Sequence, residues 1–119
     1  AADGEGSEHF KWYCSSVVGS AILVNKGSKW EVKAHNQICN QISVVQAVRE
    51  ENTNLILISC YIPPATNYQC KDVWDKLANV LKDIPSNVHF VIGGDFNAQI
   101  GREQKKGLIP SCVGNLLYH

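Results

Sequence analysis

The chain has 119 residues, of which 45% are hydrophobic and 18% charged, so we expect a packed globular core, not disorder. Its 11 Lys and Arg balance its 11 Asp and Glu, which leaves no argument from net charge for a nucleic-acid partner and none against a local basic patch. No run of residues has the length of a transmembrane helix and no signal-peptide pattern opens the chain, so we expect no membrane partner.

The five cysteines form no C-x-x-C pair and no zinc-like spacing. An odd number without a disulfide framework favours a reduced, intracellular protein in which cysteine serves as a small core residue. The chain begins with Ala1 and ends at His119 without a terminal signal, so we expect it to be a piece of a longer protein.

The first half of the chain is rich in strand patterns. Residues 1–9 are small and polar and are expected to form a frayed end or loop. A short strand is expected around Trp12, with a polar connection at 35–40 and a turn at 50–54. Apolar or alternating runs predict further strands at 19–24, 30–34, 41–49, 55–61 and 88–93.

A helix is expected between the last two of these strands. Pro63 and Pro64 end the strand before it, and Thr66 with Gln69 has the spacing of a capping box. Pro85 ends the helix. Between these two ends, apolar residues recur at helical spacing, at Val73, Trp74, Leu77, Val80, Leu81 and Ile84.

The strand at 55–61, this helix and the strand at 88–93 together predict a β-α-β unit. Such a crossover normally makes its two strands parallel, so their carboxyl ends meet at one edge of the sheet. We therefore expect Tyr61, Asp95 and Asn97 to face one crevice.

These side chains suit chemistry on a phosphate ester. Asp95 can orient water or accept its proton, and Asn97 and Tyr61 can donate hydrogen bonds to phosphate oxygens. A Mg²⁺-type ion is expected because phosphorus hydrolysis depends on neutralising charge, although Asp95 is the one obvious carboxylate. The alternative is ordinary turn chemistry, since Asp-x-Asn after two glycines also bonds its own backbone, and composition alone favours that interpretation.

Three stretches together resemble the endonuclease/exonuclease/phosphatase superfamily. They are Ile-Ser-Cys-Tyr-Ile-Pro-Pro at 58–64, Val-Ile-Gly-Gly-Asp-Phe-Asn-Ala-Gln-Ile-Gly at 91–101, and Gly-Ser-Ala-Ile-Leu-Val at 19–24. The greatest similarity is to the apurinic-type endonuclease domain of non-LTR retrotransposons and the related craniofacial development protein 2-like sequences. It covers roughly residues 17–104.

The resemblance implies an α/β fold, part of a four-layer α/β sandwich of two mixed sheets flanked by helices, here truncated at both ends as one partial domain over residues 1–119. It implies a fragment of a metal-dependent phosphodiesterase that nicks DNA, retroelement-derived, using Mg²⁺ or Mn²⁺, and nuclear with cytoplasmic passage. Asp95 matches the aspartate that orients or deprotonates water, Asn97 the asparagine on the scissile phosphate, and Tyr61 the tyrosine that donates to it.

The chain lacks other parts of the family's pattern. No residue here matches the metal-binding glutamate, so the metal ligands are unassigned, and none matches the Ser-Asp-His ending. Two alternatives remain: an inactive remnant or interaction protein that keeps the scaffold, and a phosphatase for a small phosphate ester. The sequence does not indicate an oligomeric state.

Two further features have mainly structural interpretations. The basic residues Arg102, Lys105 and Lys106 could touch a nucleic-acid backbone, but the interleaved Glu103 favours a solvated loop. The three tryptophans are expected to be core residues, not base-stacking ones.

Overall fold

The computed structural model describes residues 2–5, 9–14, 20–50 and 53–97. They form a mixed α/β structure with two sheets and one helix. Contacts divide the chain into two compact units, Ala1–Tyr61 with Pro85–Gly94, and Ile62–Ile84 with Asp95–His119. No helix in the described part of the chain is long and apolar enough to cross a membrane.

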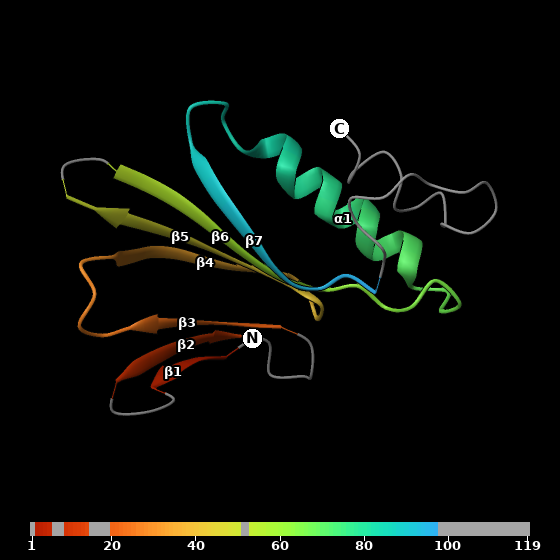
Figure 1. The fold of residues 1–119 in the computed structure, drawn as a ribbon, viewed down its shortest axis with the longest axis horizontal. Helices are drawn as coiled ribbons and strands as arrows, with labels where there is room; N and C mark the ends of the chain where they lie inside the picture. Colours follow the sequence, from red (N-terminus) through yellow and green to blue (C-terminus); the bar gives the residue numbers. More distant parts are fainter. Residues whose placement is uncertain (1, 6–8, 15–19, 51–52, 98–119) are drawn as a thin grey trace. The chain divides into compact units, whose positions relative to one another are not determined.

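The first unit holds both sheets, which face each other (Figure 1). A three-stranded antiparallel sheet has the order β1-β2-β3, and a four-stranded mixed sheet has the order β4-β5-β6-β7. Tyr13, Ile22 and Val45 are buried between them. The strands are β1 (Ala2–Glu5), β2 (Phe10–Cys14), β3 (Ala21–Asn25), β4 (Glu31–Cys39), β5 (Ile42–Arg49), β6 (Thr53–Tyr61) and β7 (His89–Asp95).

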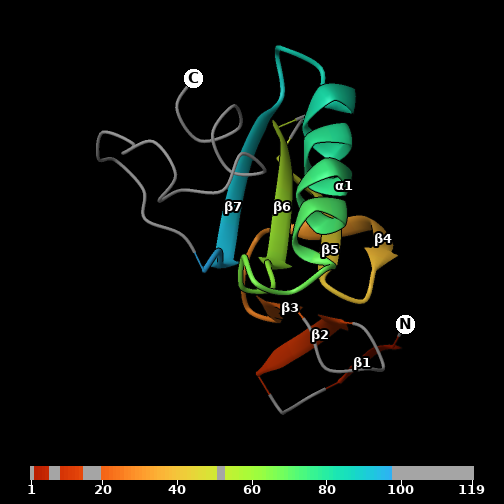
Figure 2. The ribbon, with the colours of Figure 1, turned by 90° about the vertical axis from the view of Figure 1, so that its right-hand side faces the viewer.

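The strands β6 and β7 are neighbours in the sheet and run in the same direction (Figure 2). The parallel arrangement expected of the β-α-β unit is confirmed. The long connection that contains α1 permits this arrangement, since a tight hairpin can join only antiparallel strands.

The first half of the chain has more strand than its composition suggests. Residues 2–5, expected in a frayed end or loop, pair with β2 as the strand β1. The polar connection expected at 35–40 is wrong, because β4 continues to Cys39. The turn expected at 50–54 is shorter, because β6 already begins at Thr53.

A polar network explains why β4 continues through polar residues. Ser43 on β5 is fully buried, and its hydroxyl donates to the side-chain carbonyl of Gln37 at 2.7 Å. The Nε2 of His35 lies 3.2 Å from the same hydroxyl. The amide of Gln37 in turn donates to the backbone carbonyls of Cys39 and Ile42. Burial of these polar groups is tolerated because they hydrogen-bond one another.

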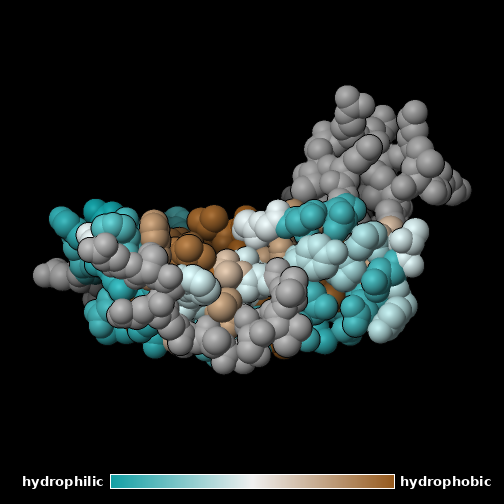
Figure 3. Space-filling model, turned by 90° about the horizontal axis from the view of Figure 1, so that it is seen from below, coloured by the Kyte–Doolittle hydropathy of each residue, from teal (hydrophilic) through white to brown (hydrophobic). Residues whose placement is uncertain are grey.

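The outer face of the three-stranded sheet is apolar. Phe10, Trp12 and Leu23 are 37%, 42% and 54% exposed, and they alternate with the buried Tyr13 and Ile22. Figure 3 shows hydrophobic residues exposed on the face it views. The expectation that Trp12 is a core residue is therefore wrong, because its position in β2 points it away from the second sheet.

The second unit contains the helix α1 (Cys70–Asp83). Its apolar stripe is buried, at Cys70, Val73, Trp74 and Leu77, which confirms Trp74 as a core residue. Two exposed ion pairs link successive turns, Lys71 with Asp75 and Lys76 with Asp72. They add a few tenths of a kcal/mol each, about 0.3–0.5.

The ends of α1 differ from the predicted capping pattern. The N-cap residue is Gln69, without a side-chain cap, so the capping box expected from Thr66 is wrong. The Asn67 side chain accepts the N–H of Gln69 at 2.8 Å and closes the turn before the helix. Ile84 is extended because the residue before a proline disfavours helical dihedrals, and the helix ends there as expected.

Candidate functional site

Asp95 and Asn97 form one tight turn at the end of β7. Asp95 is the last residue of the strand, and its Oδ1 accepts the backbone N–H of Asn97 at 3.0 Å. Asn97 has a φ of 47°, in the left-handed region that asparagine tolerates better than most residues. Both side chains are exposed. The turn chemistry expected as the alternative interpretation is thus present, and it also fixes the direction of the carboxylate.

The turn is attached to the segment that follows β6. The side-chain amide of Asn97 donates to the carbonyl of Ile62 at 2.7 Å, and the N–H of Ile62 donates to the carbonyl of Asp95 at 2.8 Å. Ile62 is fully buried. One amide hydrogen of Asn97 is therefore committed to the fold, which leaves the second hydrogen and the amide oxygen for other partners.

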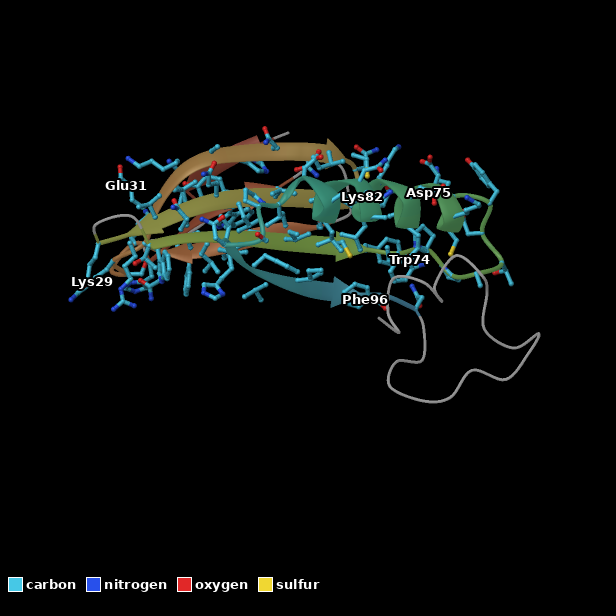
Figure 4. All side chains as sticks on the ribbon, turned by 90° about the horizontal axis from the view of Figure 1, so that it is seen from above. Lys29, Glu31, Trp74, Asp75, Lys82 and Phe96 are labelled. Carbon is cyan, nitrogen blue, oxygen red and sulfur yellow. The ribbon has the colours of Figure 1, made fainter. Side chains whose placement is uncertain are left out.

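Phe96 also anchors the turn, through a contact between aromatic rings. Its ring stacks on Trp74 of α1, with centroids 6.0 Å apart and planes inclined by 25° (Figure 4). Trp74 is 2% exposed, and its indole N–H is buried without an acceptor among the described residues. Sequence reasoning missed Phe96 and Ile62 as supports of the turn; the apolar residue between Asp95 and Asn97 was the available signal for the first.

The two glycines before Asp95 differ in whether a larger side chain would fit in their place. Gly94 has a φ of 145°, and a Cβ on it would collide with the backbone carbonyl group of Cys60 in β6. A Cβ on Gly93 would meet nothing within 4 Å. Of the two glycines, Gly94 is therefore the one that allows a close approach of the backbones.

Tyr61 is the last residue of β6 and precedes Ile62 in the chain. It is half-buried, and its backbone N–H donates to the carbonyl of Gln41 at 2.9 Å. The structure thus brings Asp95 and Asn97 together, while the participation of Tyr61 in the same site stays a prediction.

The described residues do not assemble a metal site. Among residues 2–5, 9–14, 20–50 and 53–97, no group of three or more His, Cys, Asp or Glu side chains could hold a metal ion. Asp95 alone does not match the donor set of Mg²⁺, which usually takes one or two carboxylates together with other oxygen ligands. Arg102, Lys105 and Lys106 lie outside the described residues.

The cysteines of the described residues, Cys14, Cys39, Cys60 and Cys70, are not in disulfides. Cys60 and Cys70 are buried, and Cys14 and Cys39 are half-buried. Burial, with a smaller contribution from the nearby Cys39, raises the pKa of the Cys60 thiol to about 11. A thiol that remains protonated is a poor nucleophile, which supports the interpretation of Cys60 as a core residue.

No protein-family model matches this chain, and no curated protein matches its sequence. The superfamily resemblance therefore rests on the residues at 19–24, 58–64 and 91–101 themselves.

Proposed function

We propose that this chain is part of a metal-dependent phosphodiesterase domain that acts on DNA, in which Asp95 and Asn97 face the scissile phosphate. The observation that carries the proposal is the fixed carboxylate of Asp95. One oxygen accepts the N–H of Asn97, and no other described residue bonds the carboxylate. A carboxylate held in one orientation and open to solvent can position a water molecule and take its proton.

Asn97 and Tyr61 would supply neutral donors to the phosphate. The second amide hydrogen of Asn97 is not used by its bond to Ile62, so it can donate to a phosphate oxygen. Tyr61 ends the strand beside β7, from where its hydroxyl would donate to the same anion. Both roles agree with the positions that the superfamily resemblance gives these residues.

The proposal includes an ion, Mg²⁺ or Mn²⁺, that would neutralise charge on the phosphate. The described residues do not fit this ion by themselves, so its ligands would have to come from another part of the domain, and no step is derived through it. The proposal also includes helices on the outer sides of both sheets in a four-layer sandwich, a retroelement origin and a nuclear location with cytoplasmic passage.

Nicking of supercoiled plasmid tests this proposal. We expect no nicking by this chain alone with Mg²⁺ or Mn²⁺, and nicking by the product of a longer reading frame that contains it. In that product Asp95→Asn should lower the rate by about 100-fold or more, the usual contribution of a positioned acid or base. Asp83→Asn, an exposed change at the end of α1, is the matched control. Nicking that survives Asp95→Asn would refute the role of Asp95.

A second candidate is a scaffold without activity, favoured by the hydrogen bonds that Asp95 and Asn97 make to the backbone of the fold. This second candidate predicts that neither this chain nor the longer product nicks DNA, although both are folded. Hydrolysis of a small phosphate ester without DNA nicking would instead indicate a phosphatase.

A further inference from the structure

A cavity of about 310 Å³ lies in the first unit, between the three-stranded sheet and the beginning of β4. Its position follows from the strand register, because Glu31 pairs with Val48, which pairs with Asn54 near the start of β6. Tyr61 is at the other end of that strand, roughly 20–25 Å away at about 3.3 Å per residue. The residues lining the cavity are Lys11, Tyr13, Val24, Asn25, Lys26, Trp30, Glu31 and Val32.

The charges around this cavity favour an anion. Lys11 and Lys26 line it, and the one lining carboxylate, Glu31, already pairs with Lys33 at 3.1 Å. The guanidinium of Arg49 lies 5.9 Å from the ring centroid of Trp30, but its charge is partly balanced by Glu50 at 4.0 Å. Figure 4 shows Glu31 and Lys29 at the same end of the sheets. An anionic group in the cavity would therefore meet two lining lysines and one carboxylate whose charge is partly balanced.

The walls of the cavity favour a planar aromatic group as well. Trp30 is half-buried and can present part of its ring to a ligand, whereas Tyr13 is a core residue that is 6% exposed. The ammonium of Lys11 lies 5.6 Å from the ring centroid of Tyr13, which holds a cation next to an aromatic surface. The Oδ1 of Asn25 accepts the N–H of Gly27 at 2.8 Å, and this directs its NH₂ group elsewhere as a donor.

We propose that this cavity binds a nucleoside monophosphate, with its base against Trp30 and its phosphate between Lys11 and Lys26. The volume lies at the lower end of the range for small-molecule pockets, about 300–1,000 Å³. The proposal is independent of the function proposed for Asp95, because the two sets of residues share no member and are tested separately.

Calorimetric titration of the full chain with adenosine 5′-monophosphate tests the proposal. We expect saturable binding at millimolar or lower concentration. Lys11→Gln should weaken binding about tenfold or more, since the positive charge that pairs with the phosphate is lost. Lys82→Gln on α1 removes the same charge from an exposed position outside the cavity and should leave the affinity unchanged.

A second comparison measures the affinities of the two halves of the nucleotide. Adenosine and inorganic phosphate, titrated separately, should each bind more weakly than the nucleotide. Phosphate that binds as tightly as the nucleotide would overturn the aromatic part of the proposal. The absence of binding at millimolar nucleotide, or equal affinity of Lys11→Gln and Lys82→Gln, would overturn the site.

Chemical-shift mapping on the unmodified chain keeps the test independent of any variant. Nucleotide should perturb the indole N–H of Trp30 and the amides around Lys11 and Lys26. Perturbation confined to the residues around Asp95 would place the nucleotide elsewhere and overturn the assignment.

Discussion

The side-chain amide of Asn97 donates a hydrogen bond of 2.7 Å to the backbone carbonyl of Ile62, 35 residues earlier in the chain. A residue proposed to touch phosphate therefore also holds its own turn in place. Substitution of Asn97 affects stability and chemistry together, and the two effects have to be measured separately.

Asn97→Gly should lower the free energy of unfolding by about 1 kcal/mol, because the carbonyl of the buried Ile62 loses its donor while glycine accepts the positive φ. Asn97→Ala should cost about 1 kcal/mol more, because alanine is strained at that φ. Urea denaturation of both variants and the unmodified chain measures the difference. Equal stability of Asn97→Gly and the unmodified chain would show that the hydrogen bond contributes nothing.

Gly94→Ala should destabilise the protein by about 3 kcal/mol or prevent folding, because the new methyl group would collide with the Cys60 carbonyl at a strained φ. Gly93→Ala is the matched control. A methyl group there meets no atom within 4 Å, and its effect should stay within about 0.5 kcal/mol. Thermal melts followed by circular dichroism compare the two, and similar melting temperatures would contradict the close approach of β7 to β6.

Phe96→Leu should lower the free energy of unfolding by about 1 kcal/mol, since it removes the stacked ring from Trp74 but keeps an apolar side chain. The near-ultraviolet circular dichroism of the tryptophans should weaken in the same variant. Phe90→Leu, on a ring that is 46% exposed, controls for the loss of an aromatic side chain. If Phe90→Leu changes both signals as much as Phe96→Leu, the stacking contact is not the cause.

Stability should fall at alkaline pH because of Cys60. Its pKa is about 11 in the folded chain against an ordinary 9.0, so the unfolded chain loses this proton first. The protonated Cys60 thiol therefore contributes up to about 2 kcal/mol to the free energy of unfolding. This contribution is complete below pH 9, declines as the pH rises and is lost above about pH 11. Urea denaturation between pH 8 and pH 11 measures the decline. In Cys60→Ala the decline should be shallower, and an unchanged slope would assign it to other groups.

Local sequence patterns correctly predicted those strands and helices whose buried apolar residues lie close together in the sequence. The strand at 41–49, the central strand at 55–61 and the helix with Trp74 on its buried stripe are all present, and their order alone indicated the parallel pair β6 and β7. The four-layer sandwich, with helices on the outer sides of both sheets, stays a prediction because the described residues include a single helix.

The features that sequence reasoning missed depend on distant partners. Residues 2–5 have poor strand propensity and form β1 because β2 offers a pairing edge. The polar residues His35 and Gln37 predict a loop when only the local sequence is considered. In the structure they lie in a strand because the buried Ser43 is their hydrogen-bond partner. The bond from Asn97 to Ile62 likewise cannot be inferred from a local window.

The buried Ser43 also has a consequence for how β4 finds its partner during folding. Gln37 stands opposite Ser43 in the register of β4 and β5. If β4 slipped by one residue, Gln37 would turn to the other face, and the hydroxyl of Ser43 would be buried without an acceptor. Misaligned hairpins are thereby penalised when the sheets close and bury Ser43, so this polar network selects one pairing from several that the apolar residues alone would allow.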